Sequence, residues 1–143
     1  MSARSRDERS WQTTFARTPH RLTSQRRSIM RELAAARKYL TAQELYARLA
    51  RSQPRIGLAT VYRTLETLRG LGLVSAVGRP GGEGAYLYCG VGHHHHAVCT
   101  RCGKVDDVPC RAISAFERML ASGLRFRLTE HELNFYGVCA RCS

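Results

Sequence analysis

The sequence predicts an α+β protein in which an N-terminal winged helix-turn-helix is followed by a small α/β domain. Between residues 23 and 70, apolar residues recur at every third or fourth position, a spacing typical of helices that pack on one face. After residue 70, short apolar runs alternate with turn residues, a pattern typical of strands. The 143 residues, 43% hydrophobic and 24% charged, suffice for one ordinary domain or two very small ones. This excludes a large multi-domain enzyme and a disordered chain.

Residues 1–20 are expected to form a flexible basic arm. They show no apolar periodicity, contain four arginines and end near Pro19. They also lack the apolar core of a secretory signal, and no stretch of the chain approaches the ~20 apolar residues of a membrane span. We therefore expect a cytoplasmic protein without a membrane partner, with its folded domains at residues 21–90 and 91–143.

Three helices are expected between residues 23 and 70. The first begins near Thr23 and carries an apolar stripe to residue 36. Thr41 followed by Glu44 has the spacing of a capping box and predicts the start of the second helix. After a proline and a glycine break the chain, the third helix runs from Leu58 to the glycines that begin at Gly70.

A two-stranded wing is expected to follow these helices. Leu73–Val77 and Ala85–Cys89 are strand-like runs, and the residues between them have turn chemistry. In a winged helix-turn-helix, the last helix before the wing enters the major groove of DNA. Its polar face would carry Thr60, Tyr62, Arg63, Thr64 and Thr67.

The candidate DNA contacts are Thr60, Tyr62 and Arg63 on this helix, together with Arg17 on the arm. Two alternatives remain open, since Tyr62 could pack in the core and Arg63 could pair with Glu66. The charge distribution favours DNA, because residues 1–63 hold 14 basic and 4 acidic residues and so carry +10 of the net charge of +12. Such a basic half is suited to a polyanion, although it could also be a solvated basic face.

A second domain is expected at residues 91–143. His93–Cys99 and Lys104–Val108 are strand-like, and a helix with an apolar stripe closes at Gly123. Phe126–Leu128 and Glu132–Val138 are expected to be further strands.

Two Cys-x-x-Cys pairs in this domain predict a structural zinc site. The pairs are Cys99 with Cys102 and Cys139 with Cys142, and four thiolates suit a closed, tetrahedral Zn²⁺ site. Disulfides are the alternative, but the absence of a secretory signal favours thiolate ligands. Cys110 is an additional thiol, expected to be a small buried side chain rather than a ligand or a redox-sensitive group.

A run of four histidines predicts further metal sites. Alternation along a strand directs His94 and His96 to one face and His93 and His95 to the other. Cys89, His94 and His96 would form a site whose thiolate favours zinc, and His93, His95 and His131 would form a nitrogen-rich site. The alternative is a solvated, histidine-rich strand.

These motifs resemble the ferric uptake regulator family over about residues 20–143, and Cys89 before the histidines is similar to its zinc uptake regulator branch. The resemblance implies a dimeric, metal-activated transcriptional repressor. Its winged helix would read double-stranded operator DNA, and residues 91–143 would form the dimerisation and metal-binding domain. It would use one structural Zn²⁺ and a second, sensing Zn²⁺. The resemblance rests on Gly57–Leu65, His93–His96 with Cys99-Thr-Arg-Cys102, and His131 before Cys139-Ala-Arg-Cys142.

The sequence departs from the family pattern at two sites. Ser75 stands where the zinc branch usually has Asp or His, so water, Glu83 or another nearby group would complete the sensing site. The family's third site also uses a glutamate on the following helix, where the nearest acid here is Glu117. The iron branch would have a carboxylate near Leu87 and a histidine near Tyr39, and both are absent.

The expected function is therefore a zinc-sensing repressor, with an iron- or manganese-responsive regulator of the same family as the alternative. A zinc-ribbon adaptor without DNA binding is a third possibility. A zinc enzyme is not expected, because no His-Glu-x-x-His spacing is present and the acids near His131 or at Asp106 and Asp107 lack that context. No small-molecule substrate other than a metal ion is predicted.

Overall fold

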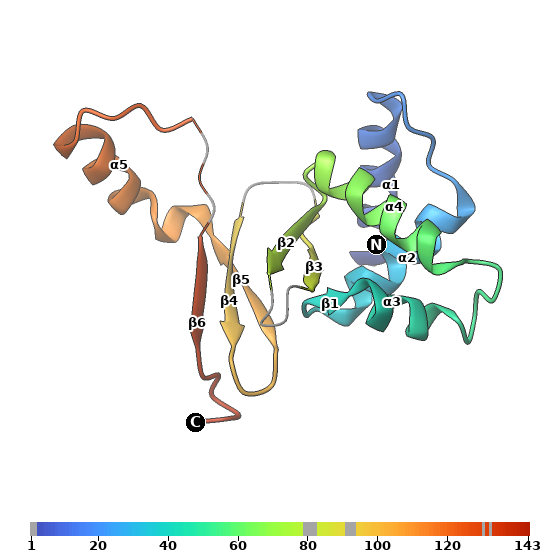
Figure 1. The fold of residues 1–143 in the computed structure, drawn as a ribbon. Helices are drawn as coiled ribbons and strands as arrows, with labels where there is room; N and C mark the ends of the chain where they lie inside the picture. Colours follow the sequence, from blue (N-terminus) through green and yellow to red (C-terminus); the bar gives the residue numbers. More distant parts are fainter. Residues whose placement is uncertain (1–2, 79–82, 91–93, 130, 132) are drawn as a thin grey trace. The chain divides into compact units, whose positions relative to one another are not determined.

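The computed structural model describes residues 3–78, 83–90, 94–129, 131 and 133–143. The chain divides into an N-terminal unit, Met1–Val91, and a C-terminal unit, Gly92–Ser143 (Figure 1). Each unit is described by itself. Among the described helices, none combines the length and the apolar character that crossing a bilayer requires.

Four helices form most of the N-terminal unit: α1 (Ala3–Ala16), α2 (Ser24–Ala36), α3 (Ala42–Leu49) and α4 (Leu58–Gly70). The Thr23 side chain caps α2 by accepting a hydrogen bond from the backbone N–H of Arg26. The predicted capping box at α3 is present, with Thr41 and Glu44 each accepting from the other's backbone N–H. Helices α2, α3 and α4 thus match the expected ones.

The prediction of a flexible arm over residues 1–20 was wrong, because Ala3–Ala16 forms helix α1. Trp11 and Phe15 lie one turn apart and are only 2% and 4% exposed, so this helix contributes two aromatic side chains to the core. The Arg31 Nε also donates to Glu8 Oε1 over 2.6 Å and ties α1 to α2. Two aromatic residues give too weak a periodic signal to reveal the helix, but their burial holds it in place.

A three-stranded antiparallel sheet completes the N-terminal unit. The predicted wing is formed by β2 (Val74–Gly78) and β3 (Gly84–Tyr88), with Val74 opposite Tyr88. The sheet order is β1-β3-β2, because β1 (Leu40–Thr41) pairs with the other edge of β3. Strand β1 was not predicted, since two residues carry no detectable alternation.

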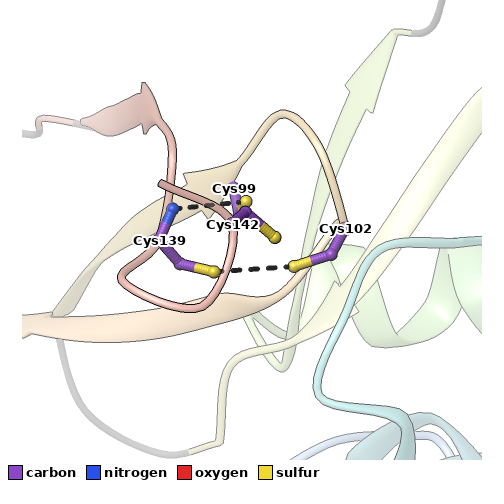
Figure 2. Close-up of side chains that lie close together, drawn as sticks. All are labelled: Cys99, Cys102, Cys139 and Cys142. Atoms are coloured by element: carbon purple, nitrogen blue, oxygen red, sulfur yellow. Dashed lines mark hydrogen bonds between the residues drawn. The ribbon is translucent and has the colours of Figure 1, made fainter.

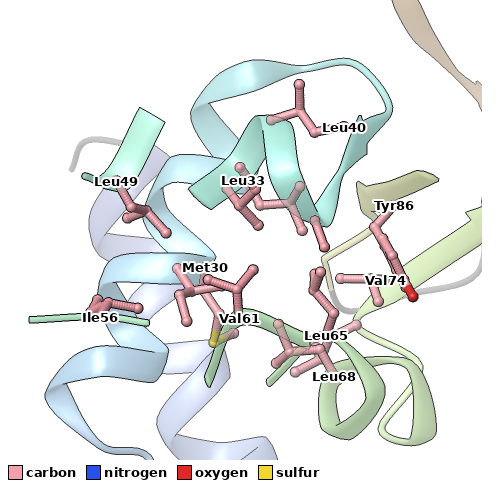
Figure 3. Close-up of a cluster of buried hydrophobic side chains, with 14 of the residues drawn as sticks. Met30, Leu33, Leu40, Leu49, Ile56, Val61, Leu65, Leu68, Val74 and Tyr86 are labelled. Atoms are coloured by element: carbon pink, nitrogen blue, oxygen red, sulfur yellow. The ribbon is translucent and has the colours of Figure 1, made fainter. Parts of the chain in front are cut away.

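The helices and this sheet enclose the hydrophobic core shown in Figure 3. Val61, Leu65 and Leu68 are completely buried and form the apolar face of helix α4. Burial of that face leaves the opposite side of α4 exposed to solvent. The core therefore fixes which residues α4 can present to a partner.

The C-terminal unit contains β4 (His94–Cys99), β5 (Val105–Pro109), η1 (Cys110–Ala112), α5 (Ser114–Gly123) and β6 (Asn134–Gly137). Its sheet order is β5-β4-β6, with β5 antiparallel and β6 parallel to the central strand. The expected strand at Phe126–Leu128 does not form, and Phe126 is 61% exposed. Apolar residues alone suggested that strand, but no strand among the described residues pairs with it.

The described part of the C-terminal unit has almost no hydrophobic core. Its only buried residues are His95, His96 and Cys99, and α5 buries none of its side chains. A unit of this size normally requires a metal, disulfides or a partner to hold its fold. Large apolar side chains lie exposed instead: Phe116, Met119, Leu124, Phe126, Phe135, Tyr136 and Val138.

Candidate metal centres and nucleic-acid interface

Four cysteines converge at one end of the C-terminal sheet (Figure 2). Parallel pairing of β4 with β6 sets Cys99 opposite Gly137, two residues before Cys139, and this closes the 36-residue gap between the two pairs. The four sulfurs lie within 4.8 Å of one another, and Cys102 Sγ is 3.8 Å from Cys139 Sγ. Sulfurs around a tetrahedral zinc with Zn–S bonds of ~2.3 Å lie ~3.8 Å apart, so the cluster fits that ion.

Backbone N–H groups prepare this cluster for a cation. Hydrogen bonds from the backbone of Cys139 and then of Cys102 lower the pKa of Cys99 to about 6. A backbone hydrogen bond from Arg141 lowers the pKa of Cys139 as well. Because the thiolate is the form that ligates metal, Cys99 favours the ligand state near neutral pH, and the shift of Cys139 is in the same direction.

Cys142 behaves in the opposite way. Hydrogen bonding with the Cys139 and Cys102 sulfurs raises the pKa of Cys142 to about 12. Sulfurs this close cannot all be charged without a cation between them, so Cys142 retains its proton. A bound metal ion would displace that proton, and metal affinity should therefore fall as the pH is lowered.

A second cluster joins His95, Glu117 and His131. The His131 Nε2 lies 2.7 Å from Glu117 Oε1 and 3.3 Å from His95 Nε2, and the two imidazole rings are 4.9 Å apart. His95 is 1% exposed, and the other two residues are partly buried. Two nitrogens and a carboxylate that converge in this way are donors that could hold a metal ion.

Glu117 was not among the predicted ligands, although it was the nearest acid on the following helix. It lies in the first turn of α5, and η1 determines where that helix begins. The sequence does show that Glu117 follows the two strands of the hairpin. Its spacing from the histidines, however, does not reveal that its side chain points toward them. His93, which was predicted for this site, lies outside the described residues.

His94 and His96 form a third group on the other face of β4, as strand alternation predicts. Their rings meet edge to face at 4.9 Å. Asp107 is opposite His96 in the β4–β5 register, and its Oδ1 lies 3.8 Å from His94 Nε2. Sequence reasoning did not select Asp107, because its approach depends on this antiparallel register.

Cys89 and Ser75 belong to the wing of the N-terminal unit. The Cys89 N–H donates to Leu73 O over 2.9 Å, and its thiol donates to Leu87 O over 3.5 Å. Ser75 Oγ lies within hydrogen-bonding distance, 3.4 Å, of the Tyr39 hydroxyl. The Ser75 side chain is thus engaged with Tyr39, and a serine hydroxyl is a poor zinc ligand.

Helix α4 presents Tyr62 and Arg63 to solvent. Tyr62 is 38% exposed, so it does not pack in the core. Arg63 is exposed and does not pair with Glu66, which instead contacts Arg69 at 3.7 Å and accepts from the Tyr86 hydroxyl at 3.2 Å. Thr64 is only 3% exposed and does not belong to the polar face where it was expected.

The remaining candidate contacts differ in exposure. Thr60, in the first turn of α4, is partly buried, whereas Arg17 is exposed directly after α1.

Tyr86 of the wing holds α4 in place through its hydroxyl. Burial, followed by the hydrogen bond to Glu66, raises the pKa of Tyr86, so the Tyr86 hydroxyl remains protonated and donates to Glu66 of α4.

A family model, that of the ferric uptake regulator family, matches residues 17–136 of the chain. The chain belongs to this family. The ferric uptake regulation protein of Bacillus subtilis is 36% identical over 130 residues, which cover 87% of this chain and 86% of that protein. Ferric uptake regulator family membership therefore confirms the resemblance found in the sequence.

Solved structures agree with this assignment and with the predicted fold class. The crystal structure of the Vibrio cholerae ferric uptake regulator is 32% identical, with a TM-score of 0.63, and the match covers 83% of this chain and 92% of that one. A zinc uptake regulator complexed with zinc and DNA is 25% identical, with a TM-score of 0.72 and coverage of 99% and 95%.

Proteins of the ferric uptake regulator family are metal-responsive transcription regulators and not enzymes. This chain is accordingly a transcription regulator. Its cysteine and histidine clusters are suited to metal binding.

Proposed function

We propose that this chain is a zinc-sensing repressor that binds operator DNA as a dimer when Zn²⁺ occupies its sensing site. The donor set of that site carries the proposal. It combines the thiol of Cys89 with the imidazoles of His94 and His96, and a thiolate favours zinc over iron or manganese. The likeness to a zinc uptake regulator complexed with zinc and DNA supports the same conclusion.

The sensing site requires a fourth ligand, and we assign Asp107 to it. Its carboxylate already faces His94 at 3.8 Å and shares a face of the sheet with His96. Ser75, by contrast, is engaged with Tyr39. Cys89 precedes His94 by five residues, so the chain tethers its thiol within ~17 Å of the histidines.

The four-cysteine cluster would hold a separate, structural zinc. A closed set of four thiolates leaves no open position for water, so this ion would stabilise the C-terminal unit and would not sense metal supply. Its donor distances support that role.

The exposed apolar side chains of α5, β6 and the segment between them would be covered by a second copy of the chain. Phe135 and Tyr136 are 45% and 62% exposed on β6, and Phe116 and Met119 are 48% and 58% exposed on α5. Exposed apolar residues in such number mark an interaction surface. A dimer would also supply the core that the described C-terminal unit lacks.

The DNA-binding surface would be the exposed side of α4, with Tyr62 and Arg63 at its centre and Thr60 and Arg17 near its edges. The basic N-terminal half supplies the charge that phosphate contacts require. An exposed arginine on a helix of this kind can read a guanine edge or a phosphate in the major groove.

The test of this function is linkage between zinc and DNA. A duplex selected from a random library by the zinc-loaded protein would be titrated with and without Zn²⁺, and Zn²⁺ would be titrated with and without duplex. We expect DNA affinity to rise by roughly 5- to 150-fold with zinc and zinc affinity to rise by the same factor with DNA. Equal affinity for DNA in both metal states would refute the proposal.

Replacing Arg63 with alanine should weaken operator binding by about 1–3 kcal/mol, or roughly 5- to 150-fold. Zinc stoichiometry and thermal stability should be unchanged, because the Arg63 side chain is exposed. Fluorescence anisotropy of a labelled duplex would measure the change. Arg127→Ala, which removes the same charge from the C-terminal unit, serves as the control, and an equal loss in both variants would argue against a DNA-reading role for Arg63.

A regulator that responds to iron or manganese is the second candidate, and the His95–Glu117–His131 cluster favours it. Nitrogen and carboxylate donors suit Fe²⁺ and Mn²⁺ better than a thiolate site does. The same titration with Fe²⁺ and with Mn²⁺ discriminates the two proposals. Stronger DNA binding with either of these ions than with Zn²⁺ would favour the second.

Replacing Glu117 with glutamine is expected to weaken metal binding at this cluster by at least about tenfold, since changing even an outer partner of a metal site typically has such an effect. Native mass spectrometry would show one fewer weakly held ion per chain. Asp106→Asn is the matched control, because Asp106 pairs with Lys104 and lies outside the cluster. An unchanged ion count in Glu117→Gln would contradict this assignment.

A further inference from the structure

Strand β3 connects the wing to two helices through alternate tyrosines. Tyr86 and Tyr88 are two positions apart and therefore lie on the same face of the strand. The Tyr86 hydroxyl donates to Glu66 of α4 over 3.2 Å. The Tyr88 hydroxyl accepts from the indole N–H of Trp11 in α1 over 2.6 Å. One strand face thus contacts both the DNA-reading helix and the N-terminal helix.

The contact between Tyr88 and Trp11 is both polar and apolar. The two rings meet edge to face, with their centroids 5.9 Å apart and an interplanar angle of 84°. Trp11 is only 2% exposed, so its N–H depends on a protein acceptor. A short hydrogen bond at the edge of a ring fixes both the distance between the Trp11 and Tyr88 rings and their relative orientation, whereas apolar packing alone does not fix the orientation.

Cys89 follows Tyr88 directly in the chain. Its N–H donates to Leu73 O, so it continues the β2–β3 ladder by one residue. Gly90 then adopts a φ of 69°, a left-handed conformation that favours glycine and ends the strand. A force on the Cys89 thiol therefore acts on the residue that directly follows β3, one peptide bond from Tyr88.

We propose that Tyr88 and Trp11 are positioning residues that transmit metal binding at Cys89 to helix α1 and thereby set the position of Arg17 for DNA. This inference rests on the proposed function. Metal coordination would fix Cys89, the peptide bond would fix Tyr88, and the hydrogen bond would orient α1. Arg17 follows the last turn of α1, where its N–H donates to Thr14 O over 3.2 Å, so it moves with the helix.

The hydroxyls along α1 strengthen this inference. Ser10, Thr13 and Thr14 line a shallow surface groove together with Arg17 and with Leu71 at the end of α4. Hydroxyls and an arginine are groups that contact phosphate and sugar oxygens of DNA. A rotation of α1 would therefore change the alignment of this whole polar surface with α4, and not of Arg17 alone.

Tyr88→Phe tests the link, because it removes one hydroxyl and keeps the ring. The measured quantity is the coupling factor, the ratio of DNA affinities with and without saturating Zn²⁺. We expect this factor to fall about fivefold, the equivalent of one typical hydrogen bond, while the four-cysteine zinc and the fold are retained. Trp11→Phe removes the other partner and should give the same loss. Tyr46→Phe, which removes an exposed hydroxyl from α3, should leave the factor unchanged.

Trp11 also provides a direct signal, because it is the only tryptophan in the chain. Its fluorescence should change when Zn²⁺ fills the sensing site of the wild type and should change much less in Tyr88→Phe. A wild-type coupling factor in both Tyr88→Phe and Trp11→Phe would overturn the link and leave the zinc-sensing function intact. An equal loss of DNA affinity with and without zinc would show a merely structural role and also overturn it. A wild type without zinc-dependent DNA binding would overturn the proposed function itself.

Discussion

Replacing Cys99 with serine is expected to release the zinc that we propose for the four-cysteine cluster and to unfold the C-terminal unit. Cys99 is the most buried of the four clustered cysteines, at 5% exposure, and it ends the central strand β4. Removing its sulfur breaks the tetrahedron at the point where β4 meets the C-terminal segment. Without the metal cation, the three remaining sulfurs would be held close together with no positive charge to offset the negative charge of their thiolates.

The effect should be large because little else stabilises this unit. Structural zinc contributes about 10–16 kcal/mol of apparent binding free energy in zinc-finger peptides near neutral pH. The described C-terminal unit buries two histidines and one cysteine, with no apolar cluster that could compensate. The N-terminal unit has its own core and should remain folded.

Hydrogen exchange followed by mass spectrometry would locate the unfolding, and metal analysis would count the zinc. Peptides from β4 and β6 should lose protection while those from α2 and α4 keep it. Cys110→Ser is the matched control, since this thiol lies outside the four-cysteine cluster. A Cys99→Ser protein that keeps one zinc per chain and a protected β4 would contradict the structural role.

Replacing Trp11 with alanine should destabilise the N-terminal unit by about 3–5 kcal/mol, the usual range for deleting a buried large aromatic side chain. The indole is 2% exposed and packs in the core beside Phe15, so its removal leaves a cavity and deletes the hydrogen bond to the Tyr88 hydroxyl. Helix α1 has few other apolar anchors in the part that the structure describes. Its helical content should therefore decrease along with stability.

Urea unfolding followed by circular dichroism would measure this change. Tyr46→Ala removes a large aromatic side chain that is 37% exposed, so it should have a clearly smaller effect. A loss of less than about 1 kcal/mol in the free energy of unfolding of Trp11→Ala would fall outside the range expected for truncating a core side chain. Such a result would favour the original prediction that residues 1–20 form a flexible arm.

The elements that the sequence predicted well are those with a long periodic pattern or a local cap. Helix α4 repeats Val61, Leu65 and Leu68 on one face, and the Thr41–Glu44 box marks the start of α3. Among the side chains of helix α1 that the structure describes, only Trp11 and Phe15 are buried, so tertiary contacts and not periodicity determine the helix. Strand β1 exists only because two residues lie beside β3.

The same distinction between local and tertiary contacts explains which site residues could be predicted. The two Cys-x-x-Cys pairs are local, so their spacing reveals them in one dimension. Glu117 and Asp107 are brought to their histidines by the start of α5 and by the β4–β5 register, which no short motif encodes. Ligands contributed by one turn of chain are predictable, whereas ligands that join through pairing require the fold.

The parallel pairing of β4 with β6 bears on the order in which the C-terminal unit assembles. Cys99 and Cys102 are neighbours in the chain and can capture an ion at once, but Cys139 lies 37 residues from Cys102. Closing a flexible loop of that length costs about 3 kcal/mol in chain entropy. An ion seated on the first pair would lower that barrier by attracting the second pair of thiolates. Metal capture would then replace hydrophobic collapse as the event that recruits β6, and the availability of zinc would set the speed of folding as well as its endpoint.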